Sequence, residues 1–248
     1  MINPFTTAYL KQEIEFYDPV PYENDGMKVY LRPIEGFTRI DEFLNKGFWS
    51  KGPDIPILAM DGVLWMSLTW MEVQSHWLPI QRANGKVLVG GLGMGYAALR
   101  FAAKASVDKV VVYETDARVI EFFEETKGHR EEFKKIEIVE ADVRAAKGEY
   151  DFAYIDIYAT LLPDEMLKDA ETMFLPGTGC TAKRFHFWGQ ELAQLSAIGA
   201  EELTEHNDVD IADFFSMWLD SGKEDLISTV PDYDFCWDLI NALGLDYN

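Results

Sequence analysis

The sequence predicts an α/β fold built on a mostly parallel sheet, and three observations support this. Between about Gly85 and Trp188, apolar runs typical of buried strands alternate with helix-like segments. A cluster of glycines directly follows the first of these runs, as is typical of a tight strand-to-helix turn. The chain of 248 residues is 48% hydrophobic, enough for a large core. We therefore expect one large domain with a smaller N-terminal region.

Residues 1–84 are predicted to form that small, β-rich N-terminal region. Its expected strands are Ile14–Tyr17, Met27–Leu31, Pro56–Met60 and Val63–Leu68. Asp61 and Gly62 separate the last two, and this dipeptide favours a two-residue hairpin because both turn residues need a positive φ. Residues 69–81 follow with a helical spacing of large apolar side chains.

Residues 85–248 are predicted to form a doubly wound domain, in which helices cover a mostly parallel sheet. Its expected strands are 86–89, 109–113, 136–139, 152–155 and an extended stretch over 180–187, and its expected helices are 96–104, 117–125 and 163–173. From about residue 189 the pattern becomes a helical tail. Residues 201–248 hold thirteen acidic residues, one lysine and several aromatic residues, so we expect this acidic tail to be folded.

Residues suited to ligand binding follow four successive strands. The glycine loop contains Gly91, Gly93 and Gly95, which allow a sharp turn and the close approach of a ligand to a helix N-terminus. The next three strands end near acidic residues, namely Glu114, Asp142 and Asp156. The carboxyl ends of parallel strands share one edge of the sheet, where α/β proteins bind ligands. A carboxylate at the second strand end can accept the hydrogens of two ribose hydroxyls.

With these residues in place, the sequence resembles the class I S-adenosylmethionine-dependent methyltransferase superfamily, and within it the spermidine synthase-like branch. The resemblance covers about residues 56–188 and implies a Rossmann-like fold. It implies that S-adenosylmethionine or its decarboxylated form is the cofactor. The four scattered histidines and two cysteines have no metal-binding spacing, so we expect no metal. The implied cofactor-binding residues are Gly91, Gly93, Gly95, Glu114, Thr115, Asp142, Val143 and Asp156. Upstream, the hairpin at Asp61-Gly62 and the segment His76–Pro79 also resemble the polyamine synthases.

The implied catalytic residue is Asp156, which would accept a proton from the acceptor or hold the amino-acid end of the cofactor. The polyamine synthases have a second acid three residues further on, where this chain has Ala159. Because paired carboxylates would hold and deprotonate an attacking amine, we expect a methyltransferase-like activity on an unidentified small molecule rather than aminopropyl transfer. The implied enzyme class is a transferase.

Other functions stay open at this stage. Gly93, Gly95 and Ala98 fit the fingerprint of an NAD-binding oxidoreductase, although that function leaves Asp142 and Asp156 without a role. A catalytically silent binding scaffold of the same fold is a further alternative. Trp65, Trp70, Trp77 and Trp188 are candidates for an acceptor pocket or for the core, and His76 and His186 are candidate bases.

Composition limits the partners. The net charge of −21 argues against nucleic acid, which binds basic surfaces, and is compatible with a cationic acceptor such as a polyamine. No apolar run approaches the length of about 18 residues that a membrane helix needs, and the first residues do not resemble a signal peptide. Two cysteines form no disulfide framework, so we expect a cytoplasmic protein. A homodimer is also compatible with the sequence.

Overall fold

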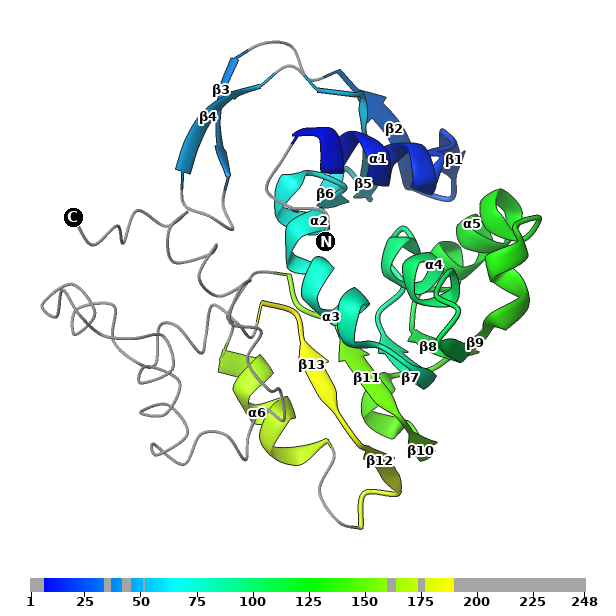
Figure 1. Ribbon diagram of the computed structural model, residues 1–248. Coiled ribbons are helices and arrows are strands. Elements are labelled where there is room, and N and C mark those ends of the chain that lie inside the picture. Colours follow the sequence, from blue (N-terminus) through cyan, green and yellow to red (C-terminus); the bar gives the residue numbers. More distant parts are fainter. Residues whose placement is uncertain are drawn as a thin grey trace, which may run out of the picture.

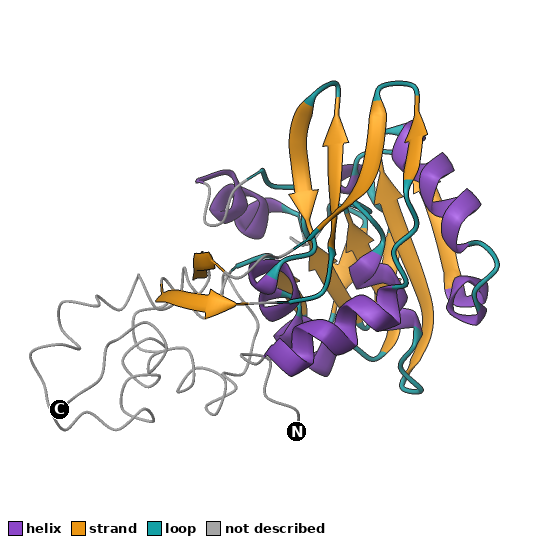
Figure 2. Ribbon diagram, turned by 90° about the horizontal axis from the view of Figure 1, so that it is seen from above, coloured by secondary structure: helices purple, strands orange, loops and turns teal. Residues whose placement is uncertain are grey.

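The computed structural model describes residues 7–33, 37–41, 46–50, 52–159, 164–173 and 177–189. Its centre is a five-stranded parallel sheet with the strand order β13-β11-β7-β8-β9. The strands are β7 (Gly85–Gly90), β8 (Val107–Glu114), β9 (Ile136–Glu140), β11 (Phe152–Ile155) and β13 (Phe185–Phe187). Figure 2 shows helices flanking the strands on both sides. The predicted α/β class and its Rossmann-like parallel sheet are confirmed.

The connections of this sheet create one site where ligands can bind. From β7 the chain runs outward through α4 (Tyr96–Ala102), β8, α5 (Ala117–Lys127), the 3-10 helix η1 (Glu131–Lys135) and β9. It then passes η2 (Val143–Ala145) and returns to place β11 on the other side of β7 (Figure 1). This reversal between β7 and β11 is a topological switch point, and a crevice opens there at the carboxyl ends of the strands.

The central strands are buried on both faces, as their sequences predict. Val87, Leu88 and Val89 of β7 are at most 1% exposed, and Phe152–Ile155 of β11 are fully buried. Such continuous apolar runs are typical of parallel strands that helices cover on both sides. A short parallel pair, β10 (Gly148–Tyr150) with β12 (Cys180–Ala182), extends this end of the domain. The predicted extended stretch over 180–187 therefore divides into two strands.

An antiparallel sheet precedes the parallel one. Its order is β1-β2-β5-β6, formed by β1 (Tyr22–Asn24), β2 (Met27–Arg32), β5 (Ile55–Met60) and β6 (Val63–Ser67). Asp61 and Gly62 have φ values of 53° and 80°, so the predicted hairpin is confirmed. A separate antiparallel pair is formed by β3 (Phe37–Asp41) and β4 (Lys46–Ser50).

The prediction of a strand at Ile14–Tyr17 is wrong, because these residues end the helix α1 (Thr7–Tyr17). Leu10, Ile14 and Tyr17 are buried and lie three and four residues apart, which is the spacing of one helix face. A run of four residues was too short to distinguish the period of a helix from that of a strand. Helix α1 packs behind the glycine loop, where the Tyr17 hydroxyl donates a hydrogen bond of 2.9 Å to the Met94 carbonyl.

The helix predicted over 69–81 is two short helices, α2 (Trp70–Ser75) and α3 (Trp77–Arg82), which meet at His76. Pro79 explains the break, because it has no N–H to donate to the carbonyl one turn earlier and its ring crowds that carbonyl. The last described helix is α6 (Asp164–Thr172). The predicted helical tail from about residue 189, with its acidic residues 201–248, lies outside the described residues.

Within the described residues, no helix combines the length and the apolar character needed to cross a membrane.

Candidate functional site

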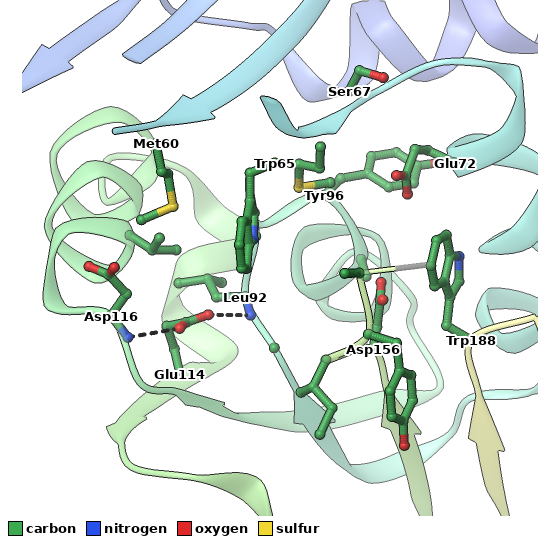
Figure 3. Close-up of a pocket in the computed structure, with 18 of the residues that line it drawn as sticks. Met60, Trp65, Ser67, Glu72, Leu92, Tyr96, Glu114, Asp116, Asp156 and Trp188 are labelled. Carbon is green, nitrogen blue, oxygen red and sulfur yellow. Dashed lines mark hydrogen bonds between the residues drawn. The ribbon is translucent and has the colours of Figure 1, made fainter. Parts of the chain in front are cut away.

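A cavity of about 1130 Å³ lies at the switch point of the parallel sheet. Its wall includes the glycine loop after β7, the loops after β8, β9 and β11, the antiparallel hairpin and helix α2. Figure 3 shows Glu114 and Asp156 on opposite sides of this cavity, with Leu92 near Glu114 and Trp188 near Asp156. The strand ends that the sequence predicts as a ligand site therefore surround one space.

The glycine loop lies directly against the end of β11. Gly91 has a φ of +86°, and a Cβ atom at this position would lie 2.0 Å from the backbone oxygen of Asp156. The Gly91 N–H donates a hydrogen bond of 2.9 Å to the Tyr113 carbonyl of β8. Gly93 has a φ of +52°, and a Cβ atom there would meet the sulfur of Met66 at 2.6 Å, although this side chain can move aside. Only glycine lets this loop lie so close to its neighbours.

Glu114 binds the glycine loop to the end of β8. Its Oε2 accepts a hydrogen bond of 2.9 Å from the Leu92 N–H, and its Oε1 accepts one of 2.9 Å from the Asp116 N–H (Figure 3). Oε1 also accepts a hydrogen bond of 2.7 Å from the Thr115 N–H. A carboxylate has about four acceptor positions, so Oε2 can accept one further hydrogen from a ligand. Glu114 thus has a structural role besides the one that the sequence predicts.

Asp142 begins the 3-10 helix η2, and its Oδ1 accepts a hydrogen bond of 2.8 Å from the Arg144 N–H. The guanidinium of Arg144 lies 3.3 Å from Asp142 Oδ2 and 2.7 Å from Oδ2 of Asp169 on α6. Asp169 is buried and also accepts a hydrogen bond of 3.0 Å from the Tyr158 hydroxyl. This network fixes the orientation of Asp142 and connects it to the loop after β11.

Asp156 lies at the other end of the cavity, in contact with His76. Its Oδ2 is 3.2 Å from His76 Nε2, and the Tyr154 hydroxyl lies 3.5 Å from the same oxygen. His76 Nδ1 lies 2.5 Å from the backbone oxygen of Glu72 and 3.8 Å from its carboxylate. Burial lowers the pKa of His76, but the hydrogen bond to Asp156 and the charges of Asp156 and Glu72 outweigh it, so the pKa is raised.

Aromatic side chains complete the wall near Asp156. Trp70 and Trp188 are each 5% exposed and line the cavity, and Trp188 Nε1 donates a hydrogen bond of 2.8 Å to the Ser75 hydroxyl of α2. Trp65 lies on the hairpin and is 61% exposed. Trp77 and His186 are buried and lie outside the described lining. Of the six predicted candidates, three tryptophans and His76 therefore line the cavity, and Trp77 and His186 are core residues.

The described lining is acidic. Six carboxylates surround the cavity, against three arginines. Two of these arginines are in ion pairs: Arg144 with Asp142 and Asp169, and Arg118 with Asp116 and Asp61. Asp116 is the N-cap residue of α5, and Asp61 lies in the turn between β5 and β6. Arg118 therefore connects the parallel-sheet domain to the antiparallel sheet on one side of the cavity. The lining favours a cationic ligand over an anionic one.

Most predicted cofactor residues meet at this cavity, which Gly91, Gly93, Glu114, Thr115, Asp142, Val143 and Asp156 line. Gly95 lies outside the described lining, where it precedes α4 with a φ of +80° and packs against Phe123. The prediction did not select Glu72, although it lies four residues before His76 and therefore on the same helix face. That spacing was the signal available in the sequence.

The sequence matches no protein-family model and no curated protein. The structure is similar to spermidine synthase from Thermotoga maritima, with 24% identity, a TM-score of 0.33 and 52% of this chain covered. A spermidine synthase bound to the transition-state analogue AdoDATO matches with 20% identity, a TM-score of 0.37 and 66% coverage. A 23S rRNA methyltransferase matches with 19% identity, a TM-score of 0.35 and 56% coverage.

These neighbours are spermidine synthases and a methyltransferase, the groups that the sequence resembles. This chain spans 58% and 65% of the two synthases and 53% of the methyltransferase.

Proposed function

We propose that this chain is an S-adenosylmethionine-dependent methyltransferase-like enzyme that acts on a small-molecule acceptor. The observation that carries the proposal is an acid-rich cavity around a glycine loop, at the switch point of a parallel sheet. A sulfonium nucleoside is cationic and suits such a lining. NAD carries a pyrophosphate, and two of the three arginines of the described lining are already paired with acids.

The residues present fit this cofactor. The glycine loop allows close approach, and Oε2 of Glu114 can accept a further hydrogen from a ribose hydroxyl. Asp142 and Val143 line the part of the cavity beyond β9, where an adenine would lie next to Glu114. Asp156 and the nearby tryptophans line the opposite side, which is left for the acceptor. The cofactor would supply an electrophilic methyl group.

The chain itself would orient the acceptor, exclude water and accept a proton. Trp70 and Trp188 provide a buried apolar wall, which limits the access of water to the acceptor side. Asp156 would accept the proton that the acceptor loses when it takes the methyl group. Alignment supplies most of the rate enhancement in such a transfer.

Aminopropyl transfer to a cationic amine is a second candidate, and Glu72 is the observation that favours it. The sequence has Ala159 where the polyamine synthases have a second acid, but Glu72 of α2 brings another carboxylate to the same wall as Asp156. Two carboxylates near one site can hold a protonated amine.

Isothermal titration calorimetry with S-adenosylmethionine, decarboxylated S-adenosylmethionine and NAD tests the proposal. We expect micromolar or tighter binding of a sulfonium nucleoside and no binding of NAD. Formation of S-adenosylhomocysteine with a panel of amines and hydroxy compounds then tests methyl transfer, and formation of methylthioadenosine tests aminopropyl transfer. Tight binding of NAD alone would contradict the proposal. Binding of a sulfonium nucleoside without turnover on any acceptor would favour a silent scaffold.

Replacing Glu114 by alanine is expected to weaken binding of S-adenosylmethionine about 10- to 100-fold, because hydrogen bonds to a charged group contribute about 1.5–3 kcal/mol. The substitution also removes the hydrogen bonds of Glu114 to backbone N–H groups and so lowers the stability of the protein. Calorimetry well below the melting temperature measures the affinity of the folded variant. Glu140→Ala is the matched control, since Glu140 is an exposed carboxylate at the end of the neighbouring β9 and lies outside the described lining. Equal affinities in both variants would refute the assignment of Glu114.

A further inference from the structure

His76 has a defined hydrogen-bonding partner on each side of its ring. It lies between α2 and α3 and is 2% exposed. The Nδ1 atom is 2.5 Å from the Glu72 backbone oxygen, and the Nε2 atom is 3.2 Å from Asp156 Oδ2. Ser75 also donates to the Glu72 carbonyl, at 3.1 Å, and itself accepts the hydrogen bond from Trp188. The ring is therefore held by α2 on one side and faces the candidate catalytic carboxylate on the other.

These contacts determine where the ring protons lie. A carbonyl oxygen only accepts hydrogen bonds, so Nδ1 carries a hydrogen and donates it to Glu72. The contact between Nε2 and Asp156 then needs one shared proton, because two acceptors at this distance would repel each other. With that proton on nitrogen, the pair is an imidazolium and a carboxylate. His76 thus binds one oxygen of Asp156 directly.

The described groups around the His76 ring are two carboxylates and two phenol rings. The carboxylates favour the protonated imidazole. Asp156 faces it from the end of β11, and Glu72 faces it from α2 with Oε2 at 3.8 Å from Nδ1. The Tyr96 ring of α4 and the Tyr154 ring of β11 pack against it, with centroids 5.5 and 5.4 Å away. Burial raises the pKa of Tyr96 well above its usual value, so its phenol is uncharged.

We propose that His76 is a positioning residue, whose protonated ring holds Oδ2 of Asp156 so that the other carboxylate oxygen faces the cavity and the acceptor. This inference rests on the proposed function, because it gives Asp156 the role of proton acceptor. The described contacts of the Asp156 carboxylate are all made by Oδ2, which leaves Oδ1 for a ligand.

The pH dependence has a definite sign. Because the folded-state pKa of His76 is raised, the stabilisation by its protonated ring is complete below about pH 6.5, the ordinary pKa of histidine. It is lost as the pH rises through the folded-state pKa. Turnover should fall over the same alkaline range, since Oδ2 of Asp156 then loses its donor.

Two substitutions separate the two sides of the ring. In His76→Gln the side-chain amide can reach the position of Nε2 and donate to Asp156 without titrating. In His76→Asn the shorter amide can reach only the position of Nδ1 and the Glu72 carbonyl. We expect His76→Gln to keep at least about ten times the kcat of His76→Asn and to lose the alkaline limb of the pH profile. Affinity for S-adenosylmethionine should stay within about twofold in both.

Nuclear magnetic resonance of the ligand-free protein tests the pair without any cofactor or acceptor. We expect Asp156→Asn to lower the pKa of the His76 imidazole, because the substitution removes the carboxylate whose hydrogen bond and charge raise it. An unchanged imidazole titration in Asp156→Asn would overturn the proposal. So would equal loss of activity in the two His76 variants, because a purely structural role predicts that result. If no sulfonium nucleoside binds, the proposed function fails while these titrations still report on the pair.

Discussion

Gly91→Ala is expected to destabilise the protein by about 3 kcal/mol or more and to abolish cofactor binding. The added Cβ would lie 2.0 Å from the backbone oxygen of Asp156 and 3.0 Å from its carbonyl carbon. Backbone atoms cannot rotate away as a flexible side chain can, so the ends of β7 and β11 must separate. The φ of +86° adds strain, because residues with a Cβ rarely adopt it.

Gly62→Ala is the matched control for this prediction. Gly62 also has a positive φ, of +80°, but a Cβ atom there would meet nothing within 4 Å. This variant isolates the backbone strain, which costs about 1–2 kcal/mol. Urea denaturation measures both variants, and calorimetry measures their affinity for S-adenosylmethionine. If Gly91→Ala loses no more stability than Gly62→Ala, the close approach of the glycine loop to β11 is contradicted.

The parallel sheet and one side of the cavity could be predicted because their signals are local. The β7 run of Val87, Leu88 and Val89 is recognisable as a buried strand, and the glycines after it indicate where the strand must turn. Glu114 and Asp142 follow from the rule that parallel strands place their carboxyl ends at one edge. The same rule does not predict what else binds these side chains. Glu114 therefore has backbone partners that the pattern did not suggest.

The contacts around Asp156 could not be predicted, because they join residues that are distant in sequence. His76 and Asp156 are eighty positions apart, and their contact depends on how the antiparallel sheet and α2 pack against the parallel sheet. In the sequence, Ala159 stands where the polyamine synthases have a second acid, and this argued against transfer to an amine. In the folded chain Glu72 supplies a carboxylate from a different element. A sequence motif depends on the spacing of residues along the chain, whereas a binding site depends only on where the side chains lie in the folded protein.

Asp156→Ala is expected to abolish turnover and to leave the fold intact. The Asp156 side chain is 22% exposed, and its described contacts are those of Oδ2 with His76 and Tyr154. The backbone hydrogen bond that fixes the end of β11, from the Asp156 N–H to the Gly90 carbonyl at 2.8 Å, does not depend on the side chain. Loss of a positioned proton acceptor lowers a rate by about 10²–10⁴-fold, whereas binding of the nucleoside depends mainly on the other side of the cavity.

Asp151→Ala is the control for this variant, because it removes an acid from the opposite end of the same strand. Asp151 accepts a hydrogen bond of 2.8 Å from the Lys86 N–H and pairs with Lys183 at 2.6 Å, away from the described lining. We expect Asp151→Ala to lower the melting temperature and to keep kcat, whereas Asp156→Ala loses kcat and also lowers the melting temperature, because it removes the contact with His76. Formation of S-adenosylhomocysteine and thermal unfolding measure the two effects. A variant without Asp156 that retained a tenth of the wild-type turnover would remove this residue from the chemistry and leave only its role in shaping the cavity.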